Sequence, residues 1–250
     1  MDFVKMQGLG NDFVVIAGPA APSVDEIQAW CDRRRGIGAD GVLEVTPLAS
    51  DRVRMRYWNA DGGLVEMCGN GLRCVARYAA DRGWVDVDSF IVETSVGPRP
   101  VRLQPDGSVC VLLGVPASGE DVSLDGIEWH TVDMGNPHAI RWVDDPTTAP
   151  VAEIGPTVAT ASVFPDGTNV EFATVTGRNQ IDLRVWERGV GETLACGTGA
   201  AATAYLAHQQ GLVGSHVAIQ LRGGVLDVHL ETDGAWIEGP AETVFSGTLS

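Results

Sequence analysis

The stretch from Arg56 to Gly71 reads RYWNADGGLVEMCGNG, and the stretch from Arg184 to Gly199 reads RVWERGVGETLACGTG. At a constant offset of 128 residues, the two stretches share an Arg, a Trp, a Gly and the whole Cys-Gly-x-Gly sequence. A register kept over the whole stretch is hard to obtain by chance. It predicts a duplicated chain in which each half carries one cysteine, Cys68 or Cys196, in the same structural setting.

Each copy predicts a β-strand, a glycine-rich turn and a cysteine at the start of a helix. The helices are expected over residues 72–82 and 200–210, which are rich in helix formers and are followed by Gly83 and Gly211 as C-terminal caps. The first turn of a helix favours negative charge, so a thiol there can have a pKa below its usual value of roughly 8.5. Most lone cysteines are simply buried small hydrophobic residues, but the duplication favours a reactive pair.

The rest of the chain predicts β-strands around these two helices. Residues 2–17 form an expected hairpin, and Ser23-Val24-Asp25-Glu26 is a capping box that starts a helix. In the second half, residues 131–138 parallel the hairpin tip and residues 150–161 can form the matching helix. Further strands are expected over residues 42–46, 52–58, 90–94, 100–104, 108–113, 169–175, 180–186, 216–221, 225–231 and 235–248. This pattern of many antiparallel strands with one central helix per half is α+β.

The length of 250 residues suits two domains of about 125 residues each, in agreement with the offset. Hydrophobic residues at 44% and charged residues at 20% are sufficient for two globular cores. We place the boundary in the small and polar segment 116–121. The N-terminal domain is then expected over residues 1–116 and the C-terminal domain over residues 117–239.

The net charge of −16 argues against nucleic acid and anionic membranes as partners, because phosphates require a basic surface. The N-terminus has no basic segment followed by an apolar core, and no apolar run approaches the length of a membrane span. Five cysteines are an odd number, which fits free thiols in a reducing compartment. We therefore expect a cytoplasmic protein.

The composition also bears on cofactors. Lys5 is the only lysine in the chain, whereas pyridoxal phosphate enzymes hold their cofactor as a Schiff base to a lysine. The sequence contains no C-x-x-C motif, no pair of histidines four residues apart, no phosphate-binding P-loop and no dinucleotide-binding glycine motif. We expect neither a cofactor nor a metal.

Taken together, the motifs closely resemble the diaminopimelate epimerase family over nearly the whole chain. The motifs that carry the resemblance are Lys5 to Phe13, Gly36 to Gly41, Asn59 to Gly62, Glu66 to Gly71, Met134 to His138, Asn169 to Phe172, Glu187 to Gly199 and Gly239 to Ala241. The departures are small: Gln7 stands where many members have His, Arg222 stands where Pro is commoner, and the chain is short.

The resemblance implies two pseudo-symmetric domains, each of antiparallel β-structure wrapped around a central helix, with the active site in the cleft between them. It also implies that the last strand, about residues 240–250, returns to complete the first domain. Such an enzyme is an isomerase that converts LL-diaminopimelate to the meso form without pyridoxal phosphate, on the route to lysine and peptidoglycan. A homodimer is an expectation, although the sequence does not give the oligomeric state.

Epimerisation by proton transfer requires removal of the proton from one face of a carbon and delivery to the other. Two catalytic groups, Cys68 as thiolate and Cys196 as thiol or the reverse, meet this requirement in both directions. The α-hydrogen of an amino acid is a very weak acid, so the carbanion must be stabilised electrostatically. The backbone N–H groups expected to bind the α-carboxylate at the two helix starts belong to Gly69, Asn70, Gly197 and Thr198.

The remaining substrate contacts follow from the resemblance. Arg188 suits the distal carboxylate, because a bidentate guanidinium grip is strong and directional. Asn11, Asn59, Asn136 and Asn169 are expected to bind the distal ammonium and carboxylate groups, with Glu187 and the supporting His138 in hydrogen bonds to substrate or thiols. Taken singly, each Asn also fits a turn residue and His138 a core or loop histidine.

Three alternatives stay open on the sequence. A related two-thiol racemase for proline, hydroxyproline or histidine would use the same thiols with different distal contacts. An isomerase of similar fold without the thiol pair is disfavoured by Cys68 and Cys196. A non-catalytic duplicated domain that binds amino acids would keep both cysteines as structural residues.

Overall fold

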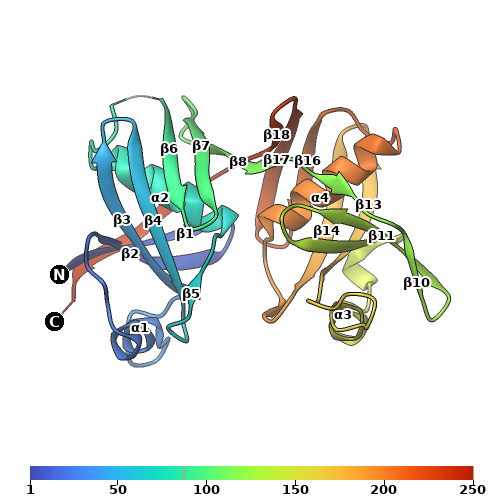
Figure 1. Ribbon diagram of the computed structural model, residues 1–250, viewed down its shortest axis with the longest axis horizontal. Coiled ribbons are helices and arrows are strands. Elements are labelled where there is room, and N and C mark those ends of the chain that lie inside the picture. The colour runs from blue at the N-terminus through green and yellow to red at the C-terminus, as the bar shows by residue number, and fades with distance from the viewer. Residues whose placement is uncertain (87, 250) are drawn as a thin grey trace. The chain divides into compact units, whose positions relative to one another are not determined.

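The computed structural model describes residues 1–86 and 88–249. The chain divides into two compact units: unit 1 comprises Met1–Val111 and the segment from Gly239 onward, and unit 2 comprises Leu112–Glu238. Within each unit, strands surround one long helix (Figure 1). Over the described ranges, no helix is both long and apolar enough to cross a membrane.

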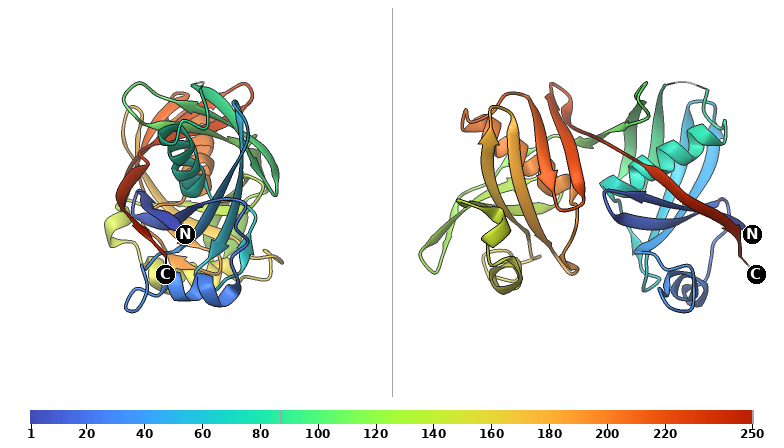
Figure 2. Two further views of the ribbon diagram at one scale, coloured as in Figure 1. Left: turned by 90° about the vertical axis from the view of Figure 1, so that its left-hand side faces the viewer. Right: turned by 180° about the vertical axis from the view of Figure 1, so that it is seen from behind.

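Unit 1 has the hydrogen-bonded strand order β19-β1-β2-β3-β4-β6-β7-β8, and the short β5 pairs with β4. The strands are β1 (Asp2–Gly8), β2 (Asn11–Ala17), β3 (Gly41–Ala49), β4 (Arg52–Asn59), β5 (Leu64–Val65), β6 (Ser89–Thr94), β7 (Gly97–Leu103), β8 (Val109–Gly114) and β19 (Glu242–Thr248). The C-terminal strand β19 runs antiparallel to β1 at the start of the chain (Figure 2).

Two helices connect the parallel strand pairs of unit 1. Helix α1 (Val24–Cys31) lies between β2 and β3, and helix α2 (Gly69–Asp81) lies between β4 and β6. Helix α2 contacts six of the surrounding strands within the described residues, and its side chains of Leu72, Cys74, Val75, Ala76 and Ala79 are fully buried. Parallel strands cannot be joined by a tight turn, so each pair requires such a crossover. Because α2 is buried and contacts strands across the sheet from β1 to β7, the sheet is wrapped around α2.

Unit 2 repeats the central part of this topology, from its first hairpin to its last. Its strand order is β11-β12-β13-β14-β16-β17-β18, with β9 and β10 on β11 and β15 on β14. The elements are β9 (Ala117–Ser118), β10 (Val122–Leu124), β11 (Ile127–Asp133), β12 (Pro137–Trp142), η1 (Pro146–Thr148), α3 (Val151–Ala159), β13 (Asn169–Gly177), β14 (Gln180–Glu187), β15 (Gly191–Glu192), α4 (Gly197–Gln209), β16 (His216–Leu221), β17 (Gly224–Glu231) and β18 (Gly234–Gly239). Helix α4 is central, and its alanines at 200, 201, 202, 204 and 207 are fully buried.

The α+β class, the N-terminal hairpin and the Ser23 capping box are confirmed. The two central helices begin three residues earlier than expected, at Gly69 and Gly197, because the cysteines themselves occupy the N-cap positions. The expectation of antiparallel pairing was incomplete, since β2–β3, β4–β6, β12–β13 and β14–β16 are parallel.

The segment 235–248, expected to form β-structure, is divided into two strands. Strand β18 ends at Gly239 and β19 begins at Glu242. Pro240 lies between them, and proline has no N–H group to donate to a strand ladder. The break separates a strand paired with β17 from a strand paired with β1.

Candidate active site

In unit 1, Cys68 is the N-cap residue of α2. Its backbone is extended, and its carbonyl oxygen accepts the first helical hydrogen bond, from Leu72 N at 2.8 Å. The next residues, Gly69 and Asn70, present N–H groups in the first turn, where a helix supplies no carbonyl acceptor. Cys68 is partly exposed, whereas the chain's other four cysteines are buried. A partly exposed thiol at a helix N-terminus is the setting in which a thiolate is stabilised.

Two asparagines predicted as site residues lie beside Cys68. The Oδ1 atom of Asn11 lies 3.5 Å from Cys68 Sγ and accepts from Asn70 Nδ2 at 3.4 Å. The Asn11 amide nitrogen donates to Asp40 Oδ2 at 2.7 Å, which fixes the side chain. Unit 1 therefore brings Asn11, Cys68 and Asn70 together. Asn59, at the end of β4, is held by a separate contact, from Tyr57 Oη to its Oδ1 at 2.7 Å.

In unit 2, Cys196 occupies the equivalent N-cap position of α4. Its Sγ accepts from Gly199 N at 3.4 Å and lies 3.5 Å from Thr198 Oγ1. A Cβ atom on Gly199 would lie 2.7 Å from Glu171 Oε1, so the last glycine of the duplicated Cys-Gly-x-Gly is required by close packing. Gly197 is buried at the first helical position.

A chain of hydrogen bonds leads from the start of α4 into the buried part of unit 2. Asn136 Nδ2 donates to Thr198 Oγ1 at 3.4 Å, and Asn136 Oδ1 lies 3.3 Å from His138 Nε2. His138 Nδ1 then lies 2.6 Å from Glu171 Oε1, and neither side chain is exposed. His138 is therefore a buried, hydrogen-bonded member of the Cys196 environment.

Two carboxylates determine the electrostatics around Cys196. Burial raises the pKa of Cys196 well above its usual value, and the charges of Glu187 and Glu171 raise it further. Burial also raises the pKa of Glu187, although hydrogen bonds with Thr193 and Cys196 oppose this shift. Near neutral pH, Cys196 is therefore in its thiol form.

Arg188 and Asn169 lie together in unit 2. Asn169 Oδ1 accepts from Arg188 N at 2.9 Å, and its Nδ2 donates to Pro137 O at 3.2 Å. Arg188 Nη1 donates to Asp166 O at 2.6 Å. Arg188 lines a cavity of about 600 Å³ that also includes Trp186 and Phe164. In this arrangement Asn169 supports the backbone that carries Arg188.

Comparisons with known proteins agree with this duplicated arrangement. A family model described as diaminopimelate epimerase matches residues 3–118 and 130–244. The chain belongs to the diaminopimelate epimerase family. It is 43% identical over 272 residues to the diaminopimelate epimerase of Alkalilimnicola ehrlichii, covering 99% of this chain and 98% of that one. It is 41% identical over 279 residues to that of Ralstonia nicotianae, covering 100% and 96%.

Solved structures show the same fold at low identity. A Bacillus anthracis phenazine biosynthesis protein has a TM-score of 0.79 at 16% identity, covering 100% of this chain and 99% of that one. A probable proline racemase from Agrobacterium radiobacter has a TM-score of 0.73 at 17% identity, covering 100% and 92%. The fold of the diaminopimelate epimerase family is thus shared with proteins of other names.

Two residues of this family member were missed as site residues. Arg73 is fully buried on α2, donates to Asn70 Oδ1 at 2.9 Å and to Pro240 O at 3.2 Å, and its charge interacts with Cys68. Glu171 is fully buried beside His138. The available signal was a charged residue within an apolar stretch, since Arg73 follows Leu72 and precedes Cys74, and Glu171 lies between Val170 and Phe172.

Proposed function

We propose that this protein epimerises diaminopimelate, with Cys68 and Cys196 as the two acid–base groups. The observation that carries the proposal is that each unit of a diaminopimelate epimerase family member places one cysteine at the N-cap of its central helix. The same motif in the same structural position twice fits a reaction that needs two equivalent groups. Under this proposal the two units are the two halves of one enzyme, and one substrate carbon must be reached by both thiols.

The different surroundings of the cysteines suggest which one is ionised before the reaction. The buried guanidinium of Arg73 and the first turn of α2 favour a thiolate at Cys68. Burial and two carboxylates keep Cys196 protonated. In one direction, Cys68 then takes the α-proton and Cys196 delivers its own proton to the opposite face. The roles are exchanged in the reverse direction.

The carbanion formed between these steps needs electrostatic stabilisation. The N–H groups of Gly69, Asn70, Gly197 and Thr198 lie in first helical turns and can donate to the α-carboxylate. Fixed backbone donors require no reorganisation as charge develops. This is the proposed role of the two glycine-rich helix starts.

The residues proposed to recognise the distal end of the substrate are polar and can form directional hydrogen bonds with it. Arg188 is proposed to bind the distal carboxylate in a bidentate manner, which requires it to exchange its contact with Asp166 O. Asn11, Asn59, Asn136 and Asn169 are proposed to contact the other polar groups, and Glu187 and His138 to hold hydrogen bonds to the substrate or the thiols. A substrate with one carboxylate would leave the Arg188 position unused.

Lys5 bears on the proposal that no pyridoxal phosphate takes part. Its ammonium is buried, lies 2.7 Å from Asp12 Oδ2 and donates to Gly38 O. The only lysine of the chain is thus part of an internal ion pair. The proposed reaction also needs reduced thiols, which fits a cytoplasmic enzyme.

The test is to incubate the purified protein with LL-diaminopimelate in deuterated water, and to follow optical rotation and α-deuterium incorporation. We expect the rotation to change with incorporation of solvent deuterium. Cys68→Ser and Cys196→Ser should each lower the rate by about 100-fold or more, because acid–base groups contribute factors of this size. Cys31→Ala is the matched control, because Cys31 is a buried cysteine on α1.

The alternatives give different results in the same assay. Faster racemisation of proline than epimerisation of diaminopimelate would assign the protein to the proline class. Absence of α-deuterium incorporation with either substrate would indicate a non-catalytic binding protein. Full activity of Cys68→Ser would contradict the two-thiol proposal.

A further inference from the structure

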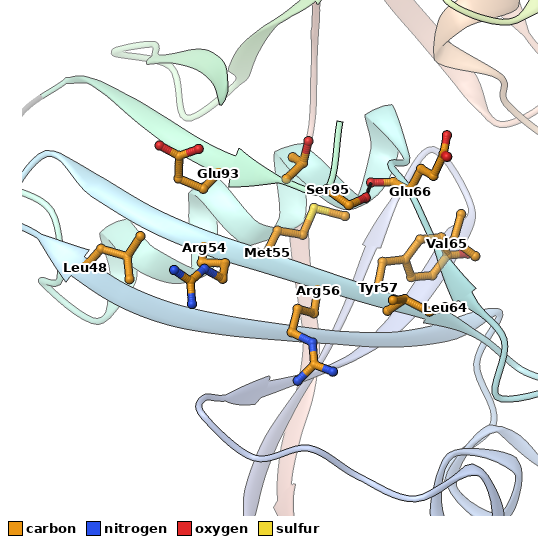
Figure 3. A pocket seen from close by; sticks show the side chains of 11 residues that line it. Leu48, Arg54, Met55, Arg56, Tyr57, Leu64, Val65, Glu66, Glu93 and Ser95 are labelled. Carbon is orange, nitrogen blue, oxygen red and sulfur yellow. Dashed lines mark hydrogen bonds between the residues drawn. The ribbon is translucent and has the colours of Figure 1, made fainter. Parts of the chain in front are cut away.

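Strand β4 of unit 1 has an opening along one edge. Near its end it pairs with β5 through Tyr57 and Trp58, and near its start it pairs with β6 through residues 52–54. Met55 and Arg56 lie between these two ladders and line a pocket of about 430 Å³ (Figure 3). The pocket is inside the size range of small-ligand sites.

The equivalent place in unit 2 holds a cluster of ion-paired side chains. Strand β14 lies 128 residues after β4, and its Trp186 pairs with Glu192 as Trp58 pairs with Leu64. There, Arg184 Nε donates to Glu192 Oε1 at 2.7 Å, and Arg222 Nη1 lies 3.1 Å from the same oxygen. A carboxylate between two guanidinium groups therefore fills this position in unit 2.

Unit 1 keeps the arginine of this arrangement but not the acid. By the same register, Arg184 corresponds to Arg56 and Glu192 to Leu64. The nearest carboxylate recorded for Arg56 is Glu44, with Nη1 to Oε1 at 3.8 Å, and the Arg56 side chain is 41% exposed. Its guanidinium also lies over the Trp58 ring, 4.6 Å from the centroid. The position of the Glu192 carboxylate is thus taken by an apolar side chain in unit 1.

The pocket lining combines two arginines and two glutamates with exposed apolar surface. Arg54 and Arg56 leave β4 on the same side (Figure 3), and over residues 1–86 and 88–249 the Arg54 side chain has no ion pair or hydrogen bond. Leu48 and Leu64 at the rim are 41% and 61% exposed. The lining acids are Glu93, which is paired with Arg52, and Glu66, which is exposed and lies beside Ser95 (Figure 3).

We propose that this pocket binds a small organic carboxylate whose apolar body lies against Leu48 and Leu64. The carboxylate would take the place that Glu192 has in unit 2, as an acceptor for Arg56 with Arg54 nearby. A planar guanidinium is a good partner for a carboxylate, and leucine side chains stabilise an apolar body by excluding water from it. Neither cysteine lines the pocket, and the proposal goes beyond the proposed function.

The pocket is connected to a proposed substrate contact. Tyr57 lines the pocket, and its hydroxyl donates to Asn59 Oδ1 at 2.7 Å. A ligand that displaces the Tyr57 ring would therefore move the side chain of Asn59. We expect occupancy of the pocket to change the KM for diaminopimelate more than kcat.

The experiment uses benzoate as the probe, titrated into the full-length protein to millimolar concentration and followed by isothermal calorimetry. We expect saturable binding to the wild type. In Leu64→Glu, which supplies the carboxylate internally, benzoate affinity should fall at least tenfold and the melting temperature should rise. Arg56→Gln should also lose affinity, without the rise in melting temperature. Leu212→Glu is the matched control, because it places the same charge on another exposed leucine and should bind as the wild type does.

Two results would overturn the proposal. One is the absence of saturable benzoate binding to the wild type. The other is equal affinity in wild type and Leu64→Glu, which would place the probe elsewhere. The melting temperature shows whether each variant is folded, so a loss of binding in an unfolded protein cannot be mistaken for support.

Discussion

His138 Nδ1 lies 2.6 Å from Glu171 Oε1, and both side chains are fully buried. The contact fixes the orientation of the imidazole ring, whose Nε2 lies 3.3 Å from Asn136 Oδ1. Asn136 is in turn bonded to Thr198 at the start of the Cys196 helix. Glu171 thus acts on the candidate site through His138, although it was not among the predicted site residues.

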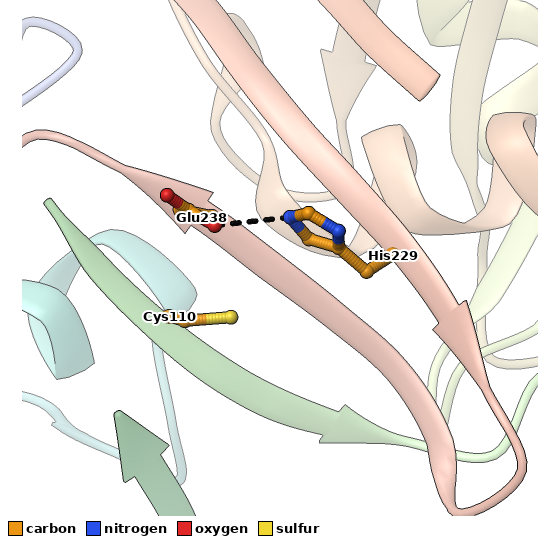
Figure 4. A group of neighbouring side chains, drawn as sticks. All are labelled: Cys110, His229 and Glu238. Atoms are coloured by element: carbon orange, nitrogen blue, oxygen red, sulfur yellow. Dashed lines mark hydrogen bonds and ion pairs between the residues drawn. The ribbon is translucent and has the colours of Figure 1, made fainter. Parts of the chain in front are cut away.

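The first prediction is that Glu171→Gln lowers kcat by about 10- to 100-fold, since a buried hydrogen bond to a charged group contributes about 1.5 to 3 kcal/mol. The KM should change little, because Glu171 is a positioning residue. Steady-state kinetics in both directions measure the effect. The control is Glu238→Gln, which alters the more exposed His229–Glu238 pair of unit 2, at 3.0 Å (Figure 4). Equal effects of the two variants would argue against a specific role for Glu171.

The second prediction concerns substrate recognition by Arg188. Arg188→Lys keeps the charge but removes the planar guanidinium group that can bind a carboxylate through two hydrogen bonds. If a buried carboxylate is bound there, kcat/KM should fall by an amount equivalent to about 2 to 4 kcal/mol of activation free energy. Kinetics with diaminopimelate measure it. The matched control Arg178→Lys, at an exposed turn, should have no effect. If kcat/KM is unchanged in Arg188→Lys, Arg188 does not bind the distal carboxylate of the substrate.

The third prediction concerns thiol reactivity. Burial raises the pKa of Cys31 to about 11 and that of Cys74 to about 12, so both should resist alkylation at neutral pH. Cys68 is the partly exposed cysteine and should react first with iodoacetamide. Peptide mapping by mass spectrometry identifies the modified residue. Activity should be lost in step with Cys68 modification, and diaminopimelate should protect.

The fourth prediction concerns acid stability. Burial would raise the pKa of Asp12, but hydrogen bonds and charge from Arg33 and Lys5 outweigh it and lower the pKa from 3.8 to about 2. A lowered pKa in the folded state means that the stabilisation is present above pH 3.8 and is lost as the pH falls toward 2.

Asp12→Asn should therefore lower the free energy of unfolding at pH 7 by about 1 to 2 kcal/mol, after allowance for solvent screening. The difference from wild type should shrink as the pH falls toward 2 and disappear below that pH. Urea unfolding at several pH values measures this change. Asp144→Asn, at an exposed position, is the control and should show no such pH dependence.

Several features of the protein follow from the sequence because their causes are local. The duplicated Cys-Gly-x-Gly places Cys68 and Cys196 before runs of helix formers, and both cysteines cap helices as a result. The capping box at Ser23 depends on residues three positions apart and forms as expected. Family membership follows in the same way, since its motifs are short stretches of chain.

Tertiary structure alone decided the features that depend on distant partners. The parallel pairing of β2 with β3 follows from a helical crossover, and the pairing of β19 with β1 joins the two ends of the chain. Arg73 and Glu171 are charged residues whose burial beside the cysteine-bearing helices depends on strands from elsewhere in each unit. The sequence shows that Leu64 replaces an acid found at Glu192. Only the three-dimensional contacts show that this difference leaves Arg56 beside an open pocket, because a hydrogen bond between side chains depends on distance in space and not on spacing in the chain.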